Sequence, residues 1–322
     1  MQAIVLHKIG GPESLKIEEV ADPKPKKNEV IVKHNAVGIN FFDHAYRTGQ
    51  YKLPKLPAIL GNEGCGIISE IGAEVKDFKV GDRVAYVNSG IGSYAEKKAV
   101  NTQNIVIVPD YISNEQVASS FLKGLMAHTL INRVFVASLV KRILIQSATS
   151  GVGHLLCQWA KYLNIEVIGT VGSDEKIDYA RSIGCSYVLN YKTQDIVAEV
   201  AKITDYGGVG IVYDSVGKDT LKKSLECLWA LGLCVSYGET SGNTEPVNLD
   251  DLVDNSLFIT RPTLTKYKSH RAELVSASNE LFLALNKGIL RPKITSYKFQ
   301  DVAKAHRDIE SKKTMGSLIL TF

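Results

Sequence analysis

Cysteine is scarce in this sequence, and its spacing excludes the common cysteine-based sites. Only five cysteines occur among 322 residues. None forms a C-x-x-C pair or has a histidine nearby at the spacing of a metal ligand, which argues against a metal-binding knot. We expect all five to be small buried side chains in a reducing compartment. They are Cys65, Cys157, Cys185, Cys227 and Cys234.

Long hydrophobic runs and clusters of one charge are also missing. Charges interrupt the apolar stretches well before the roughly 20 residues needed to cross a bilayer, so we expect no membrane segment. The first residues, Met1–Val5, lack a basic flank followed by an apolar core, and we therefore expect a cytoplasmic protein. The net charge is +4, and no stretch interleaves lysines or arginines with aromatic residues, which disfavours nucleic acid as a partner.

The length and the pattern of apolar residues predict two domains. A chain of 322 residues exceeds the usual size of one domain. The first third alternates short apolar strands with Gly, Pro, Asn and Asp, which is typical of a compact β domain. A long helical stretch from Gln116 to about Ala137 follows, and we place a domain boundary inside it. The predicted strands of the β domain are Ala3–Leu6, Leu15–Glu19, Glu29–Ala36, Gly66–Ile71 and Arg83–Val87.

Strands and helices alternate regularly from Arg142 to about Thr260. This alternation predicts a doubly wound α/β domain with six parallel strands, over residues 124–262. A helix is then expected over Arg271–Lys287, followed by two strands over Thr295–Phe299 and Gly316–Phe322. These strands most economically rejoin the β domain, which would then comprise residues 1–123 and 263–322.

The segment Ile143–His154 combines an apolar strand, a turn of small residues and the start of a helix. Small residues allow the backbone to approach a pyrophosphate, and the N–H groups and dipole at a helix start attract the anion. Ala148 occupies the first glycine position of the usual G-x-G-x-x-G pattern and a serine the second, so that only the third is glycine. Because the strand–turn–helix context is present, we expect a dinucleotide site here. The residues expected to line it are Ser150, Gly151, Val152 and Gly153.

The position about twenty residues after this turn indicates which dinucleotide is bound. An NAD site needs an acidic residue there for the ribose hydroxyls, but Gly172 occupies it. Ser173, Lys176 and Tyr191 can donate hydrogen bonds around the place where a 2′-phosphate would lie. We therefore predict NADPH as the cofactor, and we expect the two acidic residues between Ser173 and Lys176 to point to solvent.

Short motifs spread over the whole chain resemble those of one superfamily. They are Gly10–Glu13, Val37–Asp43, Gly61–Gly66, Val80–Val84, Ser150–Gly153 and Val212–Gly217. Together they resemble the medium-chain dehydrogenase/reductases, and within these the zinc-free NADPH:quinone oxidoreductases related to ζ-crystallin. The resemblance implies a GroES-like N-terminal domain, a Rossmann domain and a cleft between them where the nicotinamide meets a quinone. It also implies a homodimer, formed in relatives by edge strands of two Rossmann domains and here by Leu233–Tyr237 or a neighbouring strand.

The residues that bind zinc in the alcohol dehydrogenases of this superfamily are missing. Their G-H-E sequence supplies a histidine ligand, whereas this chain has Gly61, Asn62 and Glu63. A neutral amide is a poor zinc ligand, and no cysteine lies between Val80 and Gln103, where a structural zinc lobe would be. We therefore expect no metal. A quinone suits such a site because its electrophilic ring needs only positioning and hydrogen-bond donors.

The resemblance also implies roles for single residues. Asn40 would lie against the nicotinamide, whereas Arg47 and Tyr51 would face the acceptor. A guanidinium can stabilise developing negative charge there, and a tyrosine can stack and donate a hydrogen bond. Further cofactor contacts are implied for Ser215, Gly238 and Lys312.

Two departures from the family pattern leave the acceptor open. Relatives often carry tyrosine where this chain has Ala45 and threonine where it has Met126. His44 could act as a general acid in the vacated space, although a solvated loop histidine is the simpler interpretation. An enone or alkenal reductase is the alternative enzyme, and RNA binding or a crystallin-like structural role is the alternative of another class.

Overall fold

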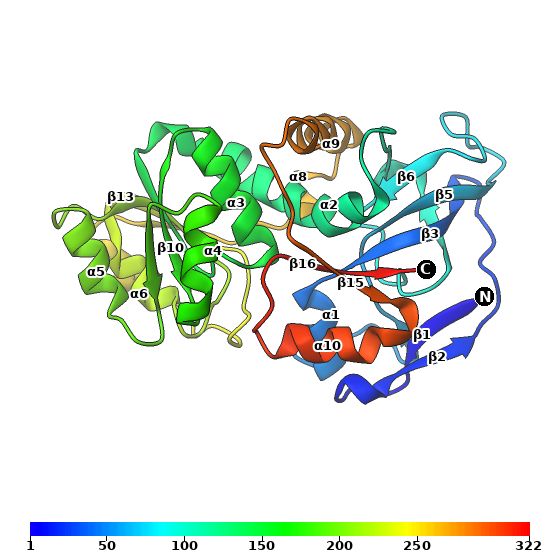
Figure 1. Ribbon diagram of the computed structural model, residues 1–322, viewed down its shortest axis with the longest axis horizontal. Helices are drawn as coiled ribbons and strands as arrows, with labels where there is room; N and C mark the ends of the chain where they lie inside the picture. The colour runs from blue at the N-terminus through cyan, green and yellow to red at the C-terminus, as the bar shows by residue number, and fades with distance from the viewer. The chain divides into compact units, whose positions relative to one another are not determined.

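The computed structural model describes residues 1–322 apart from the side chain of Ser138. The chain forms two compact units, of which the first is discontinuous (Figure 1). Unit 1 comprises Met1–Leu125, Lys268–Gly288 and Pro292–Phe322, and unit 2 comprises Met126–Tyr267 and Ile289–Arg291. The divisions expected from the sequence were after residues 123 and 262.

Unit 1 contains two β-sheets. Their strands are β1 (Gln2–Leu6), β2 (Leu15–Glu19), β3 (Glu29–Ile39), β4 (Ala58–Ile59), β5 (Gly64–Ile71), β6 (Arg83–Tyr86), β7 (Lys97–Asn101), β8 (Ile105–Ile107), β15 (Ile294–Lys298) and β16 (Ser317–Thr321). The smaller sheet has the order β2-β1-β4, and the larger sheet has the order β15-β16-β3-β5-β6-β8 with β7 paired to β3. The expected return of the last two strands to the β domain is therefore confirmed.

Strand β3 organises the larger sheet. Its sequence, EVIVKHNAVGI, is rich in β-branched residues, and most of its side chains are buried. It pairs antiparallel with β5, β7 and β16. The pairing with β16 matches Leu318 with Ile39, the last residue of β3. The segment that follows β3 therefore starts from a fixed point in the core.

Four helices accompany these sheets. They are α1 (Phe41–Thr48), α2 (Asn114–Thr129), α9 (Arg271–Asn286) and α10 (Val302–Glu310), and the division between the two units falls within α2. Helix α1 begins one residue after β3, and it ends at Gly49, whose φ of 83° lies in the left-handed region that favours glycine. One apolar core joins β1, β3, β16 and α10, with Leu6, Ile39 and Leu320 among its buried members. This core fixes both ends of the β3–α1 connection.

Unit 2 contains a six-stranded sheet that is parallel throughout. Its strands are β9 (Arg142–Ile145), β10 (Glu166–Val171), β11 (Tyr187–Asn190), β12 (Val209–Asp214), β13 (Leu228–Ser236) and β14 (Phe258–Thr260). Its helices are α3 (Gly151–Tyr162), α4 (Ile177–Ser182), α5 (Ile196–Ile203), α6 (Leu221–Glu226), α7 (Asp250–Val253) and α8 (Leu264–Tyr267). The predicted doubly wound parallel sheet is confirmed.

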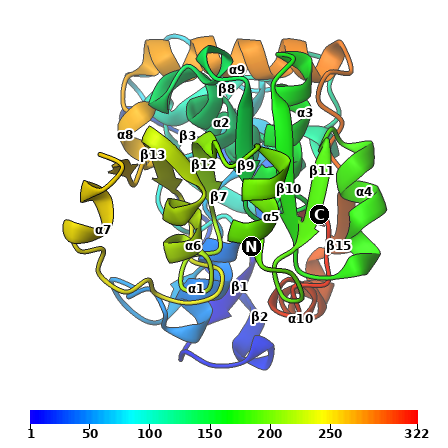
Figure 2. The same ribbon diagram turned by 90° about the vertical axis from the view of Figure 1, so that its left-hand side faces the viewer.

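The strand order of this sheet is β11-β10-β9-β12-β13-β14, and Figure 2 shows β9 between β10 and β12. The order reverses at β9, so the chain leaves the carboxyl ends of β9 and β12 toward opposite faces of the sheet. Ligands of such sheets bind at the carboxyl ends of the strands near this reversal. A ligand site is therefore expected in the segments that follow β9, β10, β11, β12 and β13.

Some local predictions need correction. The helix predicted to reach Ala137 ends at Thr129, and a π-helical turn over Leu130–Val134 follows it. The helical stretch after β10 is divided into a 3-10 turn, Asp174–Lys176, and helix α4. No helix in the described part of the chain is both long enough and apolar enough to span a membrane.

Candidate active site

The turn after β9 has the geometry of a phosphate-binding turn. Ser147 has a φ of 56°, and the Ala148 N–H donates to the Thr170 carbonyl of β10 at 2.8 Å. Ser150 is the N-cap of α3, and its Oγ accepts the Gly153 N–H at 3.1 Å. The N–H groups of the first two residues of α3, Gly151 and Val152, have no earlier helical carbonyl to bind. They are suitably placed to bind an anion.

Gly153 is required by close packing at this turn. A Cβ atom at this position would overlap the Ser147 carbonyl oxygen and would lie 2.9 Å from Ser150 Oγ. The backbone of the turn and the start of α3 can therefore approach each other only if this residue is glycine.

The ends of β10 and β11 bring the expected NADPH residues together. A Cβ atom on Gly172 would lie 2.9 Å from the Tyr191 hydroxyl, so the tyrosine lies directly over the glycine. Lys176 is half-buried, and its pKa is lowered by burial and then by the nearby charge of Lys192. Two lysines and a tyrosine therefore adjoin a strand end without an acidic residue at Gly172. Sequence reasoning missed Lys192, although it directly follows Tyr191.

The two acidic residues beside this site are exposed, as expected. Asp174 also has a partner in the protein, because the Asn190 side-chain amide donates to its Oδ1 at 2.8 Å. This bond holds the Asp174 carboxylate toward the end of β11. Ser173 is only partly exposed, and its extended backbone leads into the 3-10 turn that carries Lys176.

The expected cofactor residues Ser215 and Gly238 adjoin each other at the ends of β12 and β13. A Cβ atom on Gly238 would lie 2.9 Å from the Ser215 carbonyl oxygen. Asp214, which precedes Ser215, is buried and accepts the Val216 and Gly217 N–H groups at 2.8 and 2.9 Å. Its pKa is raised by burial even though several hydrogen bonds oppose the rise. This carboxylate fixes the loop that carries Ser215.

In unit 1, Asn40 is held by two buried carboxylates. It precedes α1 and is 5% exposed. Its side-chain Nδ2 donates to Glu63 Oε1 at 2.9 Å, and its backbone N–H donates to Asp43 Oδ2 at 2.8 Å. Since a carboxylate only accepts hydrogen bonds, the amide nitrogen must face Glu63. The Asn40 Oδ1 consequently faces the start of α1, where the side chain accepts the Asp43 backbone N–H in a capping box.

The Glu63 side chain also binds a backbone N–H group of α2. Its Oε2 accepts the backbone N–H of Leu122 at 2.8 Å, and its Oε1 lies 3.4 Å from Lys123 Nζ. Both charged side chains are buried, with exposed fractions of 1% and 7%. Glu63 and Lys123 therefore form a buried ion pair that supports Asn40. Their partnership spans 60 residues of sequence, and local patterns could not indicate it.

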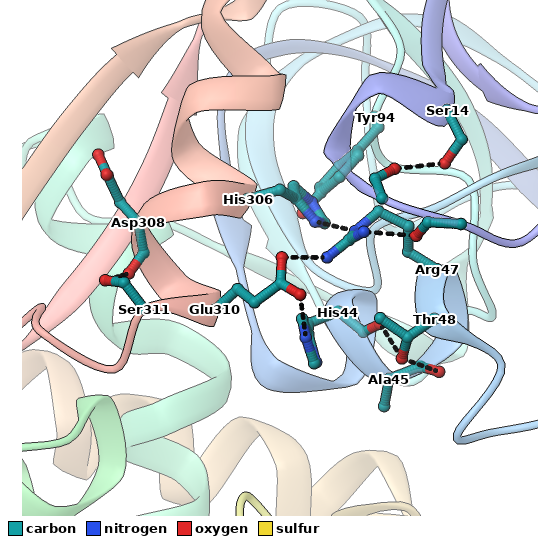
Figure 3. Close-up of polar contacts among 12 residues, drawn as sticks. Ser14, His44, Ala45, Arg47, Thr48, Tyr94, His306, Asp308, Glu310 and Ser311 are labelled. Atoms are coloured by element: carbon teal, nitrogen blue, oxygen red, sulfur yellow. Dashed lines mark hydrogen bonds and ion pairs between the residues drawn. The ribbon is translucent and has the colours of Figure 1, made fainter.

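Arg47 does not lie where the resemblance implied. It is fully buried, and each of its three nitrogen atoms binds within unit 1 (Figure 3). Nε donates to His306 Nδ1 at 3.2 Å, Nη1 to the Gly10 carbonyl at 2.5 Å and Nη2 to Glu310 at 2.9 Å. The expected contact of Arg47 with an acceptor is therefore wrong for this arrangement, because its donors hold α1 against α10 and the Gly10 segment.

The remaining candidates of unit 1 lie on or beside α1. Tyr51 is half-buried, and its ring packs against Phe42 and Tyr46 with centroids 5.7 and 6.0 Å apart. His44 Nε2 faces Glu310 Oε1 at 3.7 Å (Figure 3), and its Nδ1 is buried without a hydrogen-bond partner. Burial and then Arg47 lower the pKa of His44, and Lys312 contributes to the same shift. Lys312 is exposed and near enough to His44 to act on it electrostatically.

The residues around Asn62 do not fit a zinc site. Glu63 is occupied by its hydrogen bonds and its ion pair. Burial raises the pKa of Cys65 to about 12, and its thiol contacts the carbonyls of Ala36 and Asn114 at 3.5 and 3.2 Å. Among the residues that the structure describes, no group of three or more His, Cys, Asp or Glu side chains is arranged to hold a metal ion.

Known proteins resemble this chain along its whole length. Residues 26–110 match the family model of the alcohol dehydrogenase GroES-like domain, and residues 151–278 match that of the zinc-binding dehydrogenases. Quinone oxidoreductase 1 of Escherichia coli is 42% identical over 98% of both chains. A 2-haloacrylate reductase of a Burkholderia species is 37% identical over 99% of this chain and 98% of the relative.

A solved structure agrees with these sequence matches. The crystal structure of Escherichia coli quinone oxidoreductase complexed with NADPH has a TM-score of 0.96 and 41% identity, with all of both chains covered. The GroES-like and Rossmann domains expected from the sequence are thereby confirmed. This protein is an oxidoreductase that belongs to the quinone oxidoreductase family of the medium-chain dehydrogenase/reductases.

Proposed function

We propose that this protein reduces quinones with NADPH and without a metal ion. The observation that carries the choice of cofactor is the end of β10, where Gly172 is covered by Tyr191 and flanked by Lys176 and Lys192. An acidic residue there would repel a 2′-phosphate and would bind the free ribose hydroxyls of NADH. The Escherichia coli relative, whose structure was solved with NADPH, supports the same choice.

The chain offers a fitting cradle for the dinucleotide. The pyrophosphate would lie on the N–H groups of Gly151 and Val152, where Gly153 leaves room for it. The 2′-phosphate would bind Lys176, Lys192 and Tyr191, and Ser173 would supply a further hydroxyl. Ser215 and Gly238 would line the adjacent strand ends, and Lys312 of unit 1 would add a positive charge. Bound NADPH would supply a hydride to the acceptor.

Within unit 1, Asn40 is proposed as the residue that orients the nicotinamide. Its Nδ2 is fixed on Glu63, and the second lone pair of its Oδ1, beside the capping-box bond, would accept a hydrogen bond from the carboxamide N–H group. Tyr51 is proposed to cover the acceptor with its ring and to donate from its hydroxyl. We assign protonation of the reduced quinone to water. The pKa of His44 is lowered, so this histidine is neutral at pH 7.

Metal independence is proposed from the chemistry of the available donors. Asn62 is a weak zinc ligand, and Glu63 and Cys65 are committed to other partners. The decisive experiment follows NADPH oxidation by a small quinone before and after treatment with a chelator. Unchanged activity is expected. Stoichiometric zinc, with activity lost on chelation and restored by zinc, would overturn the proposal.

An enone or alkenal reductase is the second candidate. The 37% identical 2-haloacrylate reductase supports it, since that relative is named for an activated alkene. Relatives also often carry a tyrosine at the position of Ala45, and alanine lacks its aromatic ring. The same sample should be offered NADPH with an α,β-unsaturated ketone. A kcat/KM for the ketone that exceeds the value for the quinone would favour this second function.

We also propose a homodimer in which the β14 edges of two unit 2 sheets meet. Strand β14 ends the strand order, where it pairs with β13. Apolar side chains are exposed nearby, including Trp229 (38%), Leu231 (66%) and Phe258 (58%). Light scattering at micromolar concentration should give twice the 35.2 kDa of one chain, and Leu231→Asp should lower this mass. The mass of a single chain for the unmodified protein would contradict the dimer.

A cytoplasmic location is proposed as well. The five cysteines are all free and buried, which suits a reducing compartment. Cell fractionation followed by detection of the protein tests this proposal, and recovery in an oxidising compartment would contradict it.

A further inference from the structure

A buried chain of hydrogen bonds in unit 1 runs from Arg47 to Asp43. Arg47 Nε donates to His306 Nδ1 at 3.2 Å, and His306 Nε2 lies 3.2 Å from the Tyr94 hydroxyl (Figure 3). The Tyr94 hydroxyl donates to Asp43 Oδ2 at 3.1 Å. Arg47, Tyr94, His306 and Asp43 are all 0% exposed. The series of bonds leaves α1 at Arg47, passes through His306 of α10 and Tyr94, and returns to α1 at Asp43.

The proton on each atom of this chain can be assigned. Arg47 is always a donor, so His306 Nδ1 must be the acceptor and carries no proton. Burial lowers the pKa of His306 to about 3, so the ring is neutral and its one proton is on Nε2. His306 therefore donates to the Tyr94 oxygen. The Tyr94 proton is then left to bind Asp43.

Asp43 receives two further hydrogen bonds, both from backbone groups. Its Oδ2 accepts the Asn40 N–H at 2.8 Å, and its Oδ1 accepts the Gly61 N–H at 3.0 Å. Gly61 leads into Glu63, which accepts the Asn40 side-chain amide. Asp43 thus joins the segment that carries Asn40 to the segment that binds the Asn40 side chain. All three donors to Asp43 are fixed, so both of its oxygens are needed as acceptors.

We propose that Asp43 is a positioning residue, whose carboxylate form holds Asn40 in the orientation set by its bonds to Glu63 and to the start of α1. This inference rests on the proposed role of Asn40. Protonation of Asp43 would remove the negative charge that strengthens its three hydrogen bonds and would add an O–H donor among three donors, so these bonds would weaken. The Asn40 segment and the Gly61 segment would then separate, and the Asn40 amide would lose its fixed orientation.

The groups around Asp43 determine the pH at which its carboxylate should become protonated. Burial raises the pKa of Asp43 to about 6, although its hydrogen bonds and Lys123 lower it. Lys98 also acts on Asp43, since this carboxylate raises the pKa of Lys98. The titratable and charged groups linked to Asp43 directly or through its hydrogen-bond partners are Tyr94, His306, Arg47, Glu63, Lys98 and Lys123.

Nuclear magnetic resonance of the full chain without cofactor tests the proposal directly. With selective labelling, the carboxyl carbon of Asp43 and the side-chain amide of Asn40 are followed between pH 4.5 and 8. Both signals should change with one midpoint, close to about 6. Tyr94→Phe removes one hydrogen bond to the carboxylate, so both midpoints should rise by roughly one pH unit.

Tyr86→Phe is the matched control. Tyr86 is also fully buried in unit 1, but its hydroxyl binds His34 and Ser93 and not Asp43. In Tyr86→Phe, the midpoints of the Asp43 and Asn40 signals should equal those of the unmodified protein. An Asn40 amide signal that does not follow Asp43, or equal midpoints in the two tyrosine variants, would overturn the proposal.

An activity measurement separates this proposal from the proposed function. In active protein, kcat should fall with the same midpoint, and Tyr94→Phe should have no further effect in the Asn40→Ala background. An additive loss in the double variant would overturn the proposal. Absence of NADPH-dependent quinone reduction by the unmodified protein would instead contradict the proposed function, and the resonance titration would still decide the role of Asp43.

Discussion

One glycine and two lysines determine the chemistry at the end of β10. The hydroxyl of Tyr191 would lie 2.9 Å from a Cβ atom on Gly172, so an aspartate there would clash with the tyrosine as well as repel a phosphate. Lys176 and Lys192 act on each other electrostatically, and their mutual repulsion has to be overcome in the protein alone. A doubly charged phosphate between them would turn this repulsion into attraction.

Lys176→Ala and Lys192→Ala should each weaken NADPH binding by about tenfold at low salt, with little change for NADH. A charge-assisted bond to the 2′-phosphate is lost in each variant, and NADH has no such group. Titration of both cofactors by fluorescence measures the effect. Lys222→Ala, at an exposed site on α6, is the control and should behave like the unmodified protein. Equal losses for the two cofactors would show that the lysines do not bind the 2′-phosphate.

Gly153→Val should abolish NADPH binding, whereas Ser150→Gly should weaken it only slightly. The valine side chain would overlap the Ser147 carbonyl and fill the approach to the helix start. Glycine at an N-cap costs only a few tenths of a kcal/mol relative to serine, and the backbone N–H groups remain. Calorimetric titration with NADPH, after circular dichroism has shown that both variants fold, checks the pair. Normal binding by Gly153→Val would place the pyrophosphate elsewhere.

The residue patterns that could be interpreted from the sequence were those determined locally. The small residues of the turn after β9 and the missing acid at Gly172 lie close together in short segments, so a candidate dinucleotide site could be predicted from them. The positions of Asn40 and Arg47 depend on Glu63 and Glu310, which lie 23 and 263 residues away. No local pattern indicates such partners, and the expected role of Arg47 failed for this reason.

At the scale of elements, helix α2 is tied to a side chain from another part of unit 1. The Glu63 carboxylate accepts the Leu122 N–H of this continuous helix. The buried ammonium group of Lys123 balances the charge of the Glu63 carboxylate. The position of α2 and the orientation of Asn40 therefore depend on one ion pair.

Glu63→Gln should lower the free energy of unfolding by about 3 kcal/mol, because it leaves the buried Lys123 ammonium without its counter-charge. The double variant Glu63→Gln/Lys123→Met should recover part of this loss, since the unpaired charge is removed as well. Chemical denaturation of the two variants and the parent gives the comparison. If the double variant is less stable than Glu63→Gln alone, the ion pair does not have the assigned role.

The long apolar strands and the alternation of unit 2 were predictable because their residues repeat every two or three to four positions. The short elements were not. Helices α1 and α10 have eight and nine residues with many polar side chains, and β4 has only two residues. Such elements are stabilised by long-range contacts, including the Arg47 bonds to α10, rather than by their own sequence.

At the scale of the molecule, three fully buried groups contribute most clearly to stability in mild acid. Burial lowers the pKa of His34 to about 4 and that of His306 to about 3, and it raises the pKa of Asp43 to about 6. The unfolded chain binds protons at its histidines near pH 6.5 whereas the folded chain does not, so acidification favours unfolding. Asp43 acts in the opposite direction, because the folded state takes up its proton first.

Between pH 7 and pH 5 each histidine should remove about 2 kcal/mol from the free energy of unfolding, and Asp43 should return about 1 kcal/mol. The net loss should be about 2–3 kcal/mol. Denaturation curves at several pH values measure it. His34→Gln should reduce the dependence on pH, and the exposed His270→Gln should not. Stability that stays constant or rises from pH 7 to pH 5 would contradict the neutral state assigned to the two histidines.

The pairing of β3 with β16 affects how the protein is made on the ribosome. Strand β3 is synthesised early, but one of its partners, β16, leaves the ribosome only after all of unit 2 (Figure 1). At about 5–20 residues per second, the edge of β3 waits roughly 15–60 s for this partner. The strands of unit 2 are nearly contiguous and can fold during this interval. An unpaired apolar strand edge attracts other chains, so the nascent protein should need a chaperone mainly for its N-terminal segment.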